Sequence, residues 1–245
     1  MTTHLAIIAG TGALDMFEIL EHRPVSTPFG KPSAAPARIQ LGDQDVWFLA
    51  RHGNPHRIPP HRIDYRANIA ALMELGVREI IAINAVGSVD PELAPGALVV
   101  PDQLIDYTWG RAHSFSDSPD HELQHIEFGE PFSEATRQRV LDAGRLAQVP
   151  LINGGCYGVT QGPRLETNAE IRRLGSDGCT LVGMTAMPEA ALAREAGLAY
   201  ASLCVVANAA AGVSADSISI EEIHRVLAGA MEEVRQVLLN FTAAR

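Results

Sequence analysis

"LAYASLCVVANAAAG", residues 198–212, is an apolar run that reaches a single side-chain amide, that of Asn208. Runs of the same kind occur at five other places: HLAIIAG (4–10), DVWFLA (45–50), REIIAINA (78–85), GALVVP (96–101) and CTLVGM (179–184). They are rich in Ile, Val, Leu and Ala without polar alternation, which is typical of strands buried on both faces. We therefore expect each of them to form a strand in the interior of the protein.

Segments with helical signals separate several of these runs. DYRANIAALMELG (64–76) ends on Gly76, where a left-handed cap belongs, and SEATRQRVLDAGRLA (133–147) opens on Ser133, a good N-cap residue. Further helix starts are indicated by two capping boxes and one proline: Thr167 with Glu170, Ser219 with Glu222, and Pro188. The last helix is predicted from about residue 220 to 241 with this apolar stripe: Ile220, Ile223, Leu227, Met231, Val234 and Leu238. This alternation predicts one α/β domain over residues 1–245, in which helices flank a central mixed, largely parallel sheet.

Composition limits the partners of this chain. Of its 245 residues 47% are apolar and 20% charged, as in globular proteins, and the formal net charge is −10. Because nucleic acids and membrane surfaces attract basic proteins, we expect neither as a partner, and any anionic ligand needs local positive groups. The sequence has three cysteines at no metal-ligand spacing, and it has neither a leader-like start nor an apolar run of membrane-spanning length. We therefore expect a cytoplasmic protein with reduced thiols.

Ligands of open α/β sheets bind at the carboxyl ends of strands, so the residues that follow each apolar run are informative. Four such ends offer anion-binding chemistry: GTG (10–12), RHG (51–53), NAVGS (84–88) and MTAMPE (184–189). Glycines let backbone N–H groups approach an oxyanion, Thr11 and Thr185 add hydroxyl donors, and Arg51 offers a forked cation matched to phosphate. Taken alone, GTG also fits a tight turn, and Arg51 with His52 also fits a solvated pair.

Dinucleotide and metal sites fit the sequence poorly. GTG is no dinucleotide fingerprint, because Asp15 stands where the third glycine belongs. Six histidines lie in two loops: His52, His56 and His61 in RHGNPHRIPPHR (51–62), and His113, His121 and His125 in the long loop 111–131. Their spacings match no zinc pattern, so we predict no metal site and expect most of them to be solvated.

Seven motifs, in order along nearly the whole chain, carry a family resemblance: IIAGTG (7–12), STPFGKPSA (26–34), LARHG (49–53), NAVGS (84–88), QGPRLETNAE (161–170), GMTAMPEAALAREAGLAYAS (183–202) and the Asn208 segment. Together they resemble the trimeric purine nucleoside phosphorylase superfamily, particularly its methylthioadenosine phosphorylase branch. The resemblance implies reversible phosphorolysis, in which phosphate attacks C1′ of a purine nucleoside and releases the base and a sugar 1-phosphate. It also implies inorganic phosphate as co-substrate, no metal or organic cofactor, and a homotrimer with sites near the subunit boundaries.

The resemblance also assigns roles to individual residues. The phosphate pocket would be formed by Thr11, Arg51, His52, Ala85 and Thr185. Met184 would pack on the ribose, and the purine would be faced by Leu165, Glu166, Asn208, Ala209 and Ala210. His125, in LQHIEF, falls where the methylthio branch carries a histidine that reaches the sugar end of a neighbouring subunit's site.

Asn208 is the expected catalytic residue. If the ribosyl group gains oxocarbenium character, a phosphate dianion beneath C1′ stabilises it, and Arg51 must position that anion. The purine leaves with the electrons of the broken bond, and the amide of Asn208 can donate to N7 at any ordinary pH because it does not titrate. The alternative is that Asn208 caps a strand end through backbone hydrogen bonds.

Base choice is where the chain departs from the branch it most resembles. Methylthioadenosine phosphorylases resemble one another in carrying aspartates at the positions of Asn208 and Ala210 and a serine at that of Glu166. A 6-oxopurine offers an N1–H donor and an O6 acceptor, so an accepting carboxylate of Glu166 and a donating Asn208 match hypoxanthine. A buried mispaired carboxylate would cost about 1 to 3 kcal/mol. The alternative for Glu166 is that it only favours the start of the following helix.

The other end of the nucleoside is read by apolar residues. Ile220 stands where 6-oxopurine nucleoside phosphorylases place a histidine for the 5′-hydroxyl, and Ile223 follows one turn later. An apolar wall favours a methylthio group over a hydroxyl by about 10- to 200-fold. Both isoleucines also fit an ordinary core role in the last helix.

These features together predict cleavage of S-methyl-5′-thioinosine by phosphate to hypoxanthine and 5-methylthioribose 1-phosphate. Two enzymes remain as alternatives, a methylthioadenosine phosphorylase that releases adenine and a general phosphorylase of inosine and guanosine. A nucleoside sensor without turnover is a further alternative, against which the phosphate-binding residues argue. An NAD-dependent enzyme is disfavoured by the incomplete glycine fingerprint.

Overall fold

The computed structural model describes residues 4–10, 13, 16–117, 122–215 and 218–243. Its strands are β1 Leu5–Ala9, β2 Ile19–His22, β3 Ala37–Leu41, β4 Gln44–Ala50, β5 Glu79–Ser88, β6 Leu98–Val100, β7 Gln103–Asp106, β8 Leu151–Asn153, β9 Cys156–Val159, β10 Leu181–Gly183 and β11 Ala199–Ala209. Its helices are α1 Tyr65–Glu74, α2 Glu134–Ala147, α3 Asn168–Ser176, α4 Ala186–Glu195 and α5 Ile220–Ala243, with short 3-10 turns η2 Pro60–Arg62 and η3 Phe115–Asp117.

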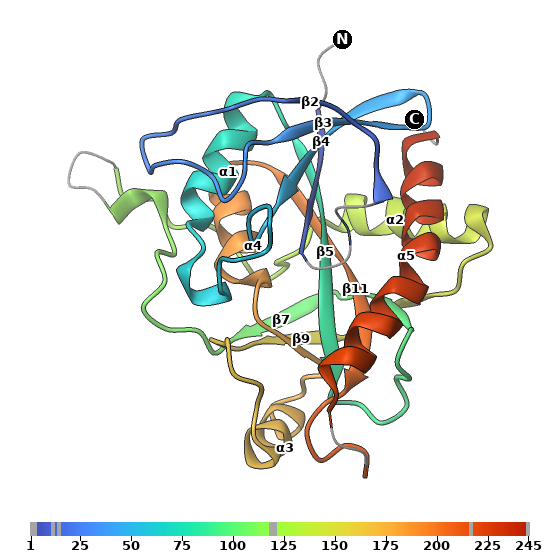
Figure 1. Cartoon of the computed structure of the whole chain (residues 1–245). Helices are drawn as coiled ribbons and strands as arrows, with labels where there is room; N and C mark the ends of the chain where they lie inside the picture. Colours follow the sequence, from blue (N-terminus) through green and yellow to red (C-terminus); the bar gives the residue numbers. More distant parts are fainter. Residues whose placement is uncertain (1–3, 11–12, 14–15, 118–121, 216–217, 244–245) are drawn as a thin grey trace.

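The long strand β5 is the centre of the sheet. It pairs in parallel with β1 on one side and with β11 on the other, and its last two residues pair antiparallel with β10. The sheet runs in the order β2-β3-β4-β1-β5-β10-β9-β7, and β11 leads away from β5 to β6 and β8. Figure 1 shows β5 crossing the molecule from end to end beside β11. Ala9 pairs with Ala50 and Ile83, so the carboxyl ends of β1 and β4 lie beside the middle of β5, and β5 and β11 continue together beyond them.

Alternate residues of β1 enter two different hydrophobic cores. Leu5, Ile7 and Ala9 belong to a cluster that includes residues of α2 and α5, whereas Ala6 and Ile8 belong to a cluster with α1 and α4. In Figure 1, α2 and α5 lie to the right of β5, and α1 and α4 lie to its left. Burial on both faces explains the apolar runs without alternation, because neither face of these strands meets water.

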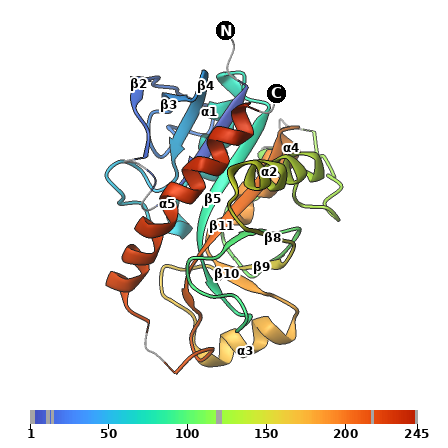
Figure 2. The same cartoon turned by 90° about the vertical axis from the view of Figure 1, so that its right-hand side faces the viewer.

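A third, smaller cluster lies at one end of the molecule. It joins Ile171 and Leu174 of α3 to Val89, Val182 and other residues at the ends of β5 and β10. Figure 2 shows α3 at the end opposite to β2, β3 and β4. The segment between β9 and α3, residues 160–167, carries two of the predicted base-facing residues, Leu165 and Glu166.

The predicted fold class is confirmed, and each of the six apolar runs contains a strand. Within the described ranges, six strand pairs are parallel (β1β4, β1β5, β5β11, β6β8, β7β9 and β9β10) and four are antiparallel (β2β3, β3β4, β5β10 and β6β11). The sequence reasoning missed five strands: β2, β3, β7, β8 and β9. Four of these have three or four residues, and β2, β7 and β8 are mostly exposed or half-buried, so they lack the long apolar signature.

The predicted helix signals lie at real helix ends. Ser133 accepts a hydrogen bond from the backbone of Thr136, and Thr167 and Glu170 form the reciprocal capping box. Gly76 has a φ of 81°, in the left-handed region that a side chain disfavours. Ser219 Oγ accepts from the Glu222 backbone N–H at 3.4 Å, and Ser219 O accepts from the Ile223 backbone N–H at 3.0 Å. Among the described residues, no helix has the length and apolar character needed to cross a membrane.

Candidate active site

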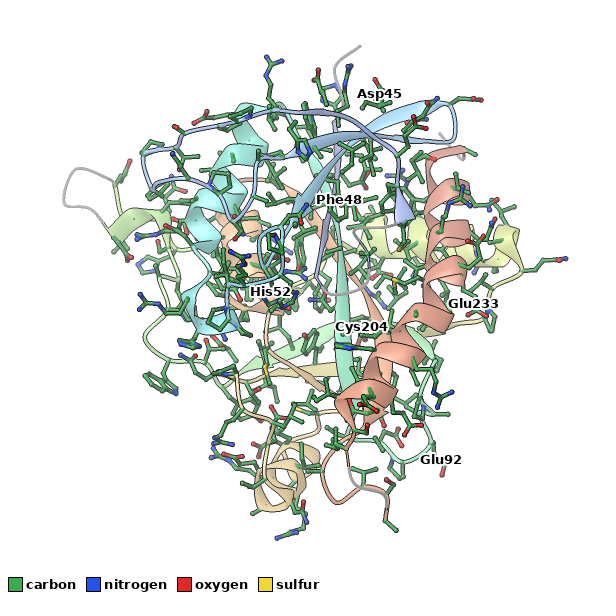
Figure 3. All side chains as sticks on the ribbon, in the orientation of Figure 1. Asp45, Phe48, His52, Glu92, Cys204 and Glu233 are labelled. Atoms are coloured by element: carbon green, nitrogen blue, oxygen red, sulfur yellow. The ribbon has the colours of Figure 1, made fainter. Side chains whose placement is uncertain are left out.

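A cavity of about 520 Å³ lies at the carboxyl ends of the central strands, and the first turns of α5 form one of its walls. Its volume is in the range of small-molecule sites. The predicted site residues that line it are Arg51, His52, Ala85, Leu165, Glu166, Met184, Thr185, Asn208, Ala210, Ile220 and Ile223. In Figure 3, His52 and Cys204 lie near the centre of the molecule, whereas Asp45, Glu92 and Glu233 lie at its periphery.

Two of the predicted residues, Ala209 and His125, are not in this lining, and a third cannot be placed. Thr11 lies outside the described residues, although its neighbour Gly10 contributes to the cavity. Ala209 follows Asn208 but is not part of the lining, and His125 lies in an exposed stretch of the loop before α2. Within the described part of the chain, no group of three or more His, Cys, Asp or Glu side chains could hold a metal ion.

Arg51 is buried and paired with a carboxylate that the sequence reasoning missed. Its side chain is 1% exposed, and Nε and Nη2 donate to the two oxygens of Glu189 at 2.7 and 2.9 Å. Nη2 also approaches Ile8 O at 3.4 Å, and Nη1 donates to Ile83 O at 3.0 Å. Burial opposes its charge, but Glu189 outweighs this effect and raises the pKa of Arg51.

Arg51 and His52 are therefore not a solvated pair. The guanidinium fork of Arg51, which we expected to bind phosphate, is instead directed at a protein carboxylate. The fork engages Glu189 because a buried cation needs a compensating carboxylate. Four of the five N–H groups of Arg51 are used by Glu189, Ile8 and Ile83. Among the described residues, the second N–H on Nη1 has no acceptor, so it is left for a ligand in the cavity.

His52 is a neutral side chain with a defined tautomer. Burial, together with the nearby Arg51 charge, lowers its pKa to about 4. Its Nδ1 lies 2.8 Å from the carbonyl oxygen of Ile58, which can only accept, so Nδ1 carries the proton and Nε2 keeps a lone pair. A Cβ at Gly10 would come within 3.2 Å of the ring, which explains the glycine in that position. His56 stacks on the other side at 4.3 Å between ring centroids.

Thr185 is held by a buried chain of polar side chains. Ser202 Oγ donates to Asn84 Oδ1 at 2.7 Å, and Asn84 Nδ2 donates to Thr185 Oγ1 at 2.9 Å. Asn84 and Ser202 are 1% and 0% exposed, so water does not compete for the hydrogen bonds that support Thr185. Because Thr185 Oγ1 already accepts from Asn84, its own proton is free to point into the cavity. The available signal for both supporting residues was a polar side chain inside an otherwise apolar run.

Asn208 is directed into the cavity by an irregularity of β11. Val206 pairs with Val86 and Asn208 with Gly87, so the register shifts by one residue between them. Such a bulge re-aims the side chain that follows it. Asn208 Nδ2 donates to Ala209 O at 2.7 Å, which is one backbone hydrogen bond of the kind expected if Asn208 caps the strand end. Its second N–H and its carbonyl oxygen form no hydrogen bond with other described residues and remain for a ligand in the cavity.

Glu166 lines the cavity next to Leu165 and is not the carboxylate that caps α3. That role belongs to Glu170, whose oxygens accept from Arg164 and from the backbone of Thr167. Glu166 Oε1 instead accepts from Thr160 Oγ1 at 2.6 Å. Oε2 of Glu166 has no hydrogen bond in the described chain, so it is available as an acceptor.

The wall formed by α5 is apolar over three turns. It is lined by Ile220, Ile223, Leu227 and Met231, with Ile218 just before the helix. Ile220 is 57% exposed, whereas Leu227 and Met231 are buried at 3% and 6%. The predicted core role of this stripe is therefore wrong for Ile220 and correct for the residues further along α5.

Three chemically different surfaces thus face one cavity. One offers buried anion-binding groups, one an amide and a carboxylate, and one an apolar wall. This combination, at the carboxyl ends of a doubly covered α/β sheet, can accommodate a small anion beside a ligand that has both polar and apolar parts.

The family model described as "Phosphorylase superfamily" matches residues 4–243. A probable S-methyl-5′-thioinosine phosphorylase from Xanthomonas campestris is 51% identical over 89% of both chains. The 6-oxopurine nucleoside phosphorylase of Pyrococcus furiosus is 42% identical over 96% of this chain and 90% of its own. Among solved structures, methylthioadenosine phosphorylase from Schistosoma mansoni in complex with adenine has a TM-score of 0.93, with 35% identity over 99% of this chain and 91% of that one. The chain therefore belongs to the phosphorylase superfamily, as a pentosyl-transferring enzyme of the purine nucleoside phosphorylase type.

Proposed function

We propose that the protein catalyses the phosphorolysis of S-methyl-5′-thioinosine to hypoxanthine and 5-methylthioribose 1-phosphate. One observation carries this proposal: a carboxylate with an open acceptor, Glu166, shares the cavity with the amide of Asn208 and with the apolar wall of α5. The relatives at 51% and 42% identity, named for S-methyl-5′-thioinosine and for 6-oxopurine nucleosides, support a 6-oxopurine substrate.

The phosphate end explains how a protein of net charge −10 holds an anion. Thr185 and Arg51 each direct one donor into the cavity, and Nε2 of neutral His52 matches the hydroxyl of monohydrogen phosphate. Thr11 stays a prediction for this subsite. Because Arg51 is largely engaged by Glu189, it orients the phosphate without fully neutralising its charge, so the anion can still stabilise an oxocarbenium-like C1′.

The base end provides for the leaving group. A phosphate oxygen forms the new bond to C1′ while the C1′–N9 bond breaks. The electron pair of the C1′–N9 bond passes into the purine. The free N–H of Asn208 stabilises that charge by donating to N7, and Oε2 of Glu166 accepts from N1–H. In adenine N1 is an acceptor, so a carboxylate at this position disfavours a 6-aminopurine. The reaction proposed here uses no metal or organic cofactor.

The oligomeric state belongs to the same proposal. We expect a homotrimer in the cytoplasm, in which His125 of one subunit reaches the sugar end of the next. Two observations support a subunit contact near this loop: Trp109 and Leu123 are 71% and 69% exposed, and large exposed apolar side chains favour interfaces.

The decisive assay incubates purified protein and phosphate with methylthioinosine, methylthioadenosine or inosine, and compares kcat/KM for release of the base. We expect methylthioinosine to exceed both of the other nucleosides. The likeness to methylthioadenosine phosphorylase from Schistosoma mansoni favours methylthioadenosine as the second candidate, and a preference for it would overturn the argument from Glu166. Nucleoside binding without phosphate-dependent base release would instead indicate a sensor.

A further inference from the structure

Thr160, directly after β9, is outside the cavity but touches its base-reading carboxylate. Its hydroxyl oxygen lies 2.6 Å from Glu166 Oε1 and 3.3 Å from Gly183 O. A hydroxyl has one proton, and Gly183 O already accepts the Thr160 backbone N–H at 2.8 Å. The shorter contact is in the range of a hydroxyl donating to a carboxylate, so the proton is directed to Glu166.

Thr160 is itself held in place by a buried part of the sheet and by a cation. Nη2 of Arg111 donates to the carbonyl oxygens of Thr160 and Gln161 at 3.2 and 2.8 Å. Nη1 of the same guanidinium donates to Met184 O at 2.9 Å, so Arg111 ties the end of β9 to the end of β10. Thr160 therefore offers a fixed donor, whereas Glu166 has a long side chain with several rotatable bonds.

Within the described residues, Thr160 supplies the one hydrogen bond to the Glu166 carboxylate. The nearest cation in sequence, Arg164, is committed to both oxygens of Glu170. Without Thr160, nothing in this part of the chain would hold Glu166 in the orientation that leaves Oε2 facing the nucleobase.

We propose that Thr160 is a positioning residue that makes Glu166 a fixed acceptor and thereby sets the preference for 6-oxopurine nucleosides. The proposal rests on the function proposed above. When Oε1 is occupied by the Thr160 proton, Oε2 keeps one orientation toward the N1–H of the bound base. When the hydroxyl is absent, the Glu166 side chain becomes mobile. The difference in binding free energy between a 6-oxopurine and a 6-aminopurine then decreases.

The test compares Thr160→Val, which keeps the shape but lacks the hydroxyl, with Thr160→Ser, which retains it. We expect the valine variant to lower the ratio of kcat/KM for methylthioinosine to that for methylthioadenosine by about 10-fold, mainly through KM for methylthioinosine. The serine variant should stay within about 2-fold of the wild type, and KM for phosphate should not change in either variant.

A double-mutant cycle separates positioning from a general structural role. In the Glu166→Gln background, Thr160→Val should have no further effect on the substrate ratio, because its target is already removed. An unchanged ratio in Thr160→Val, or an equal loss for both nucleosides that serine does not restore, would overturn the proposal. If the valine variant fails to fold, the affinity of Thr160→Ala for hypoxanthine relative to adenine, measured by calorimetry, provides the same comparison. Failure of the proposed function would appear separately, as a wild-type enzyme that does not prefer methylthioinosine.

Discussion

Replacing Glu189 by glutamine should destabilise the protein strongly, because Glu189 is the buried counter-charge of Arg51. Glu189 is 0% exposed and accepts from Arg51 Nε, Arg51 Nη2 and the hydroxyl of Tyr200 at 2.7, 2.9 and 2.9 Å. The substitution leaves a buried guanidinium without a counter-charge and turns an amide donor toward existing donors. Loss of one partner of a buried ion pair costs about 3 to 5 kcal/mol. For a chain of this length that lowers Tm by about 6 to 20 °C.

The assay is thermal and denaturant unfolding of both proteins, together with KM for phosphate. We expect that KM to rise, because Glu189 also orients the Arg51 group that faces the cavity. The matched control is Glu232→Gln, which removes an exposed partner of Arg235 at 3.6 Å and should change stability by at most about 0.5 kcal/mol. A Glu189→Gln protein within about 1 kcal/mol of the wild type would refute the claim that this ion pair supports the phosphate end.

Three further predictions follow from the site. Asn208→Ala should lower kcat by about 100-fold and leave KM for phosphate unchanged in steady-state kinetics, and an unaltered kcat would contradict its leaving-group role. Ile220→His should shift kcat/KM from methylthioinosine toward inosine by about 10-fold, and a constant ratio would show that Ile220 does not read the 5′ group. The pKa of His52 is lowered to about 4 in the folded protein, so between about pH 6.5 and 4 the unfolded chain binds more protons than the folded chain. Acidification through this range should therefore lower the free energy of unfolding by up to about 3 kcal/mol. His52→Gln should flatten that pH dependence in unfolding titrations, and a curve parallel to the wild type would exclude His52 as its source.

The interior strands were predictable because burial on both faces leaves a strong signature in the sequence. The strand ends were predictable for the same reason, since a polar residue directly after such a run has few structural uses. The supporting residues were missed because their partners lie far away in the chain: Asn84 bonds Thr185, Arg51 bonds Glu189, and Ser202 bonds Asn84, at separations of 101, 138 and 118 residues. Each supporting residue is a polar residue within an apolar stretch. The sequence therefore indicates that such a residue has a hydrogen-bond partner, but it does not identify the partner.

Burial divides the site into two parts with different tolerance for change. Arg51, Thr185 and His52, at the proposed phosphate end, are 1%, 7% and 9% exposed, and they are hydrogen-bonded to Glu189, Asn84 and Ile58 respectively. Glu166 is half-buried and Ile220 is 57% exposed, and they stand on a loop and on the first turn of a helix. Substitution at the phosphate end therefore disturbs the buried polar network and the stability of the fold. Substitution at the base and 5′ ends alters contacts with the nucleoside at little cost in stability, because surface changes away from such networks cost about 0.5 kcal/mol or less. Within one fold, the choice of purine and of 5′ group can thus change while the phosphorolysis itself is retained.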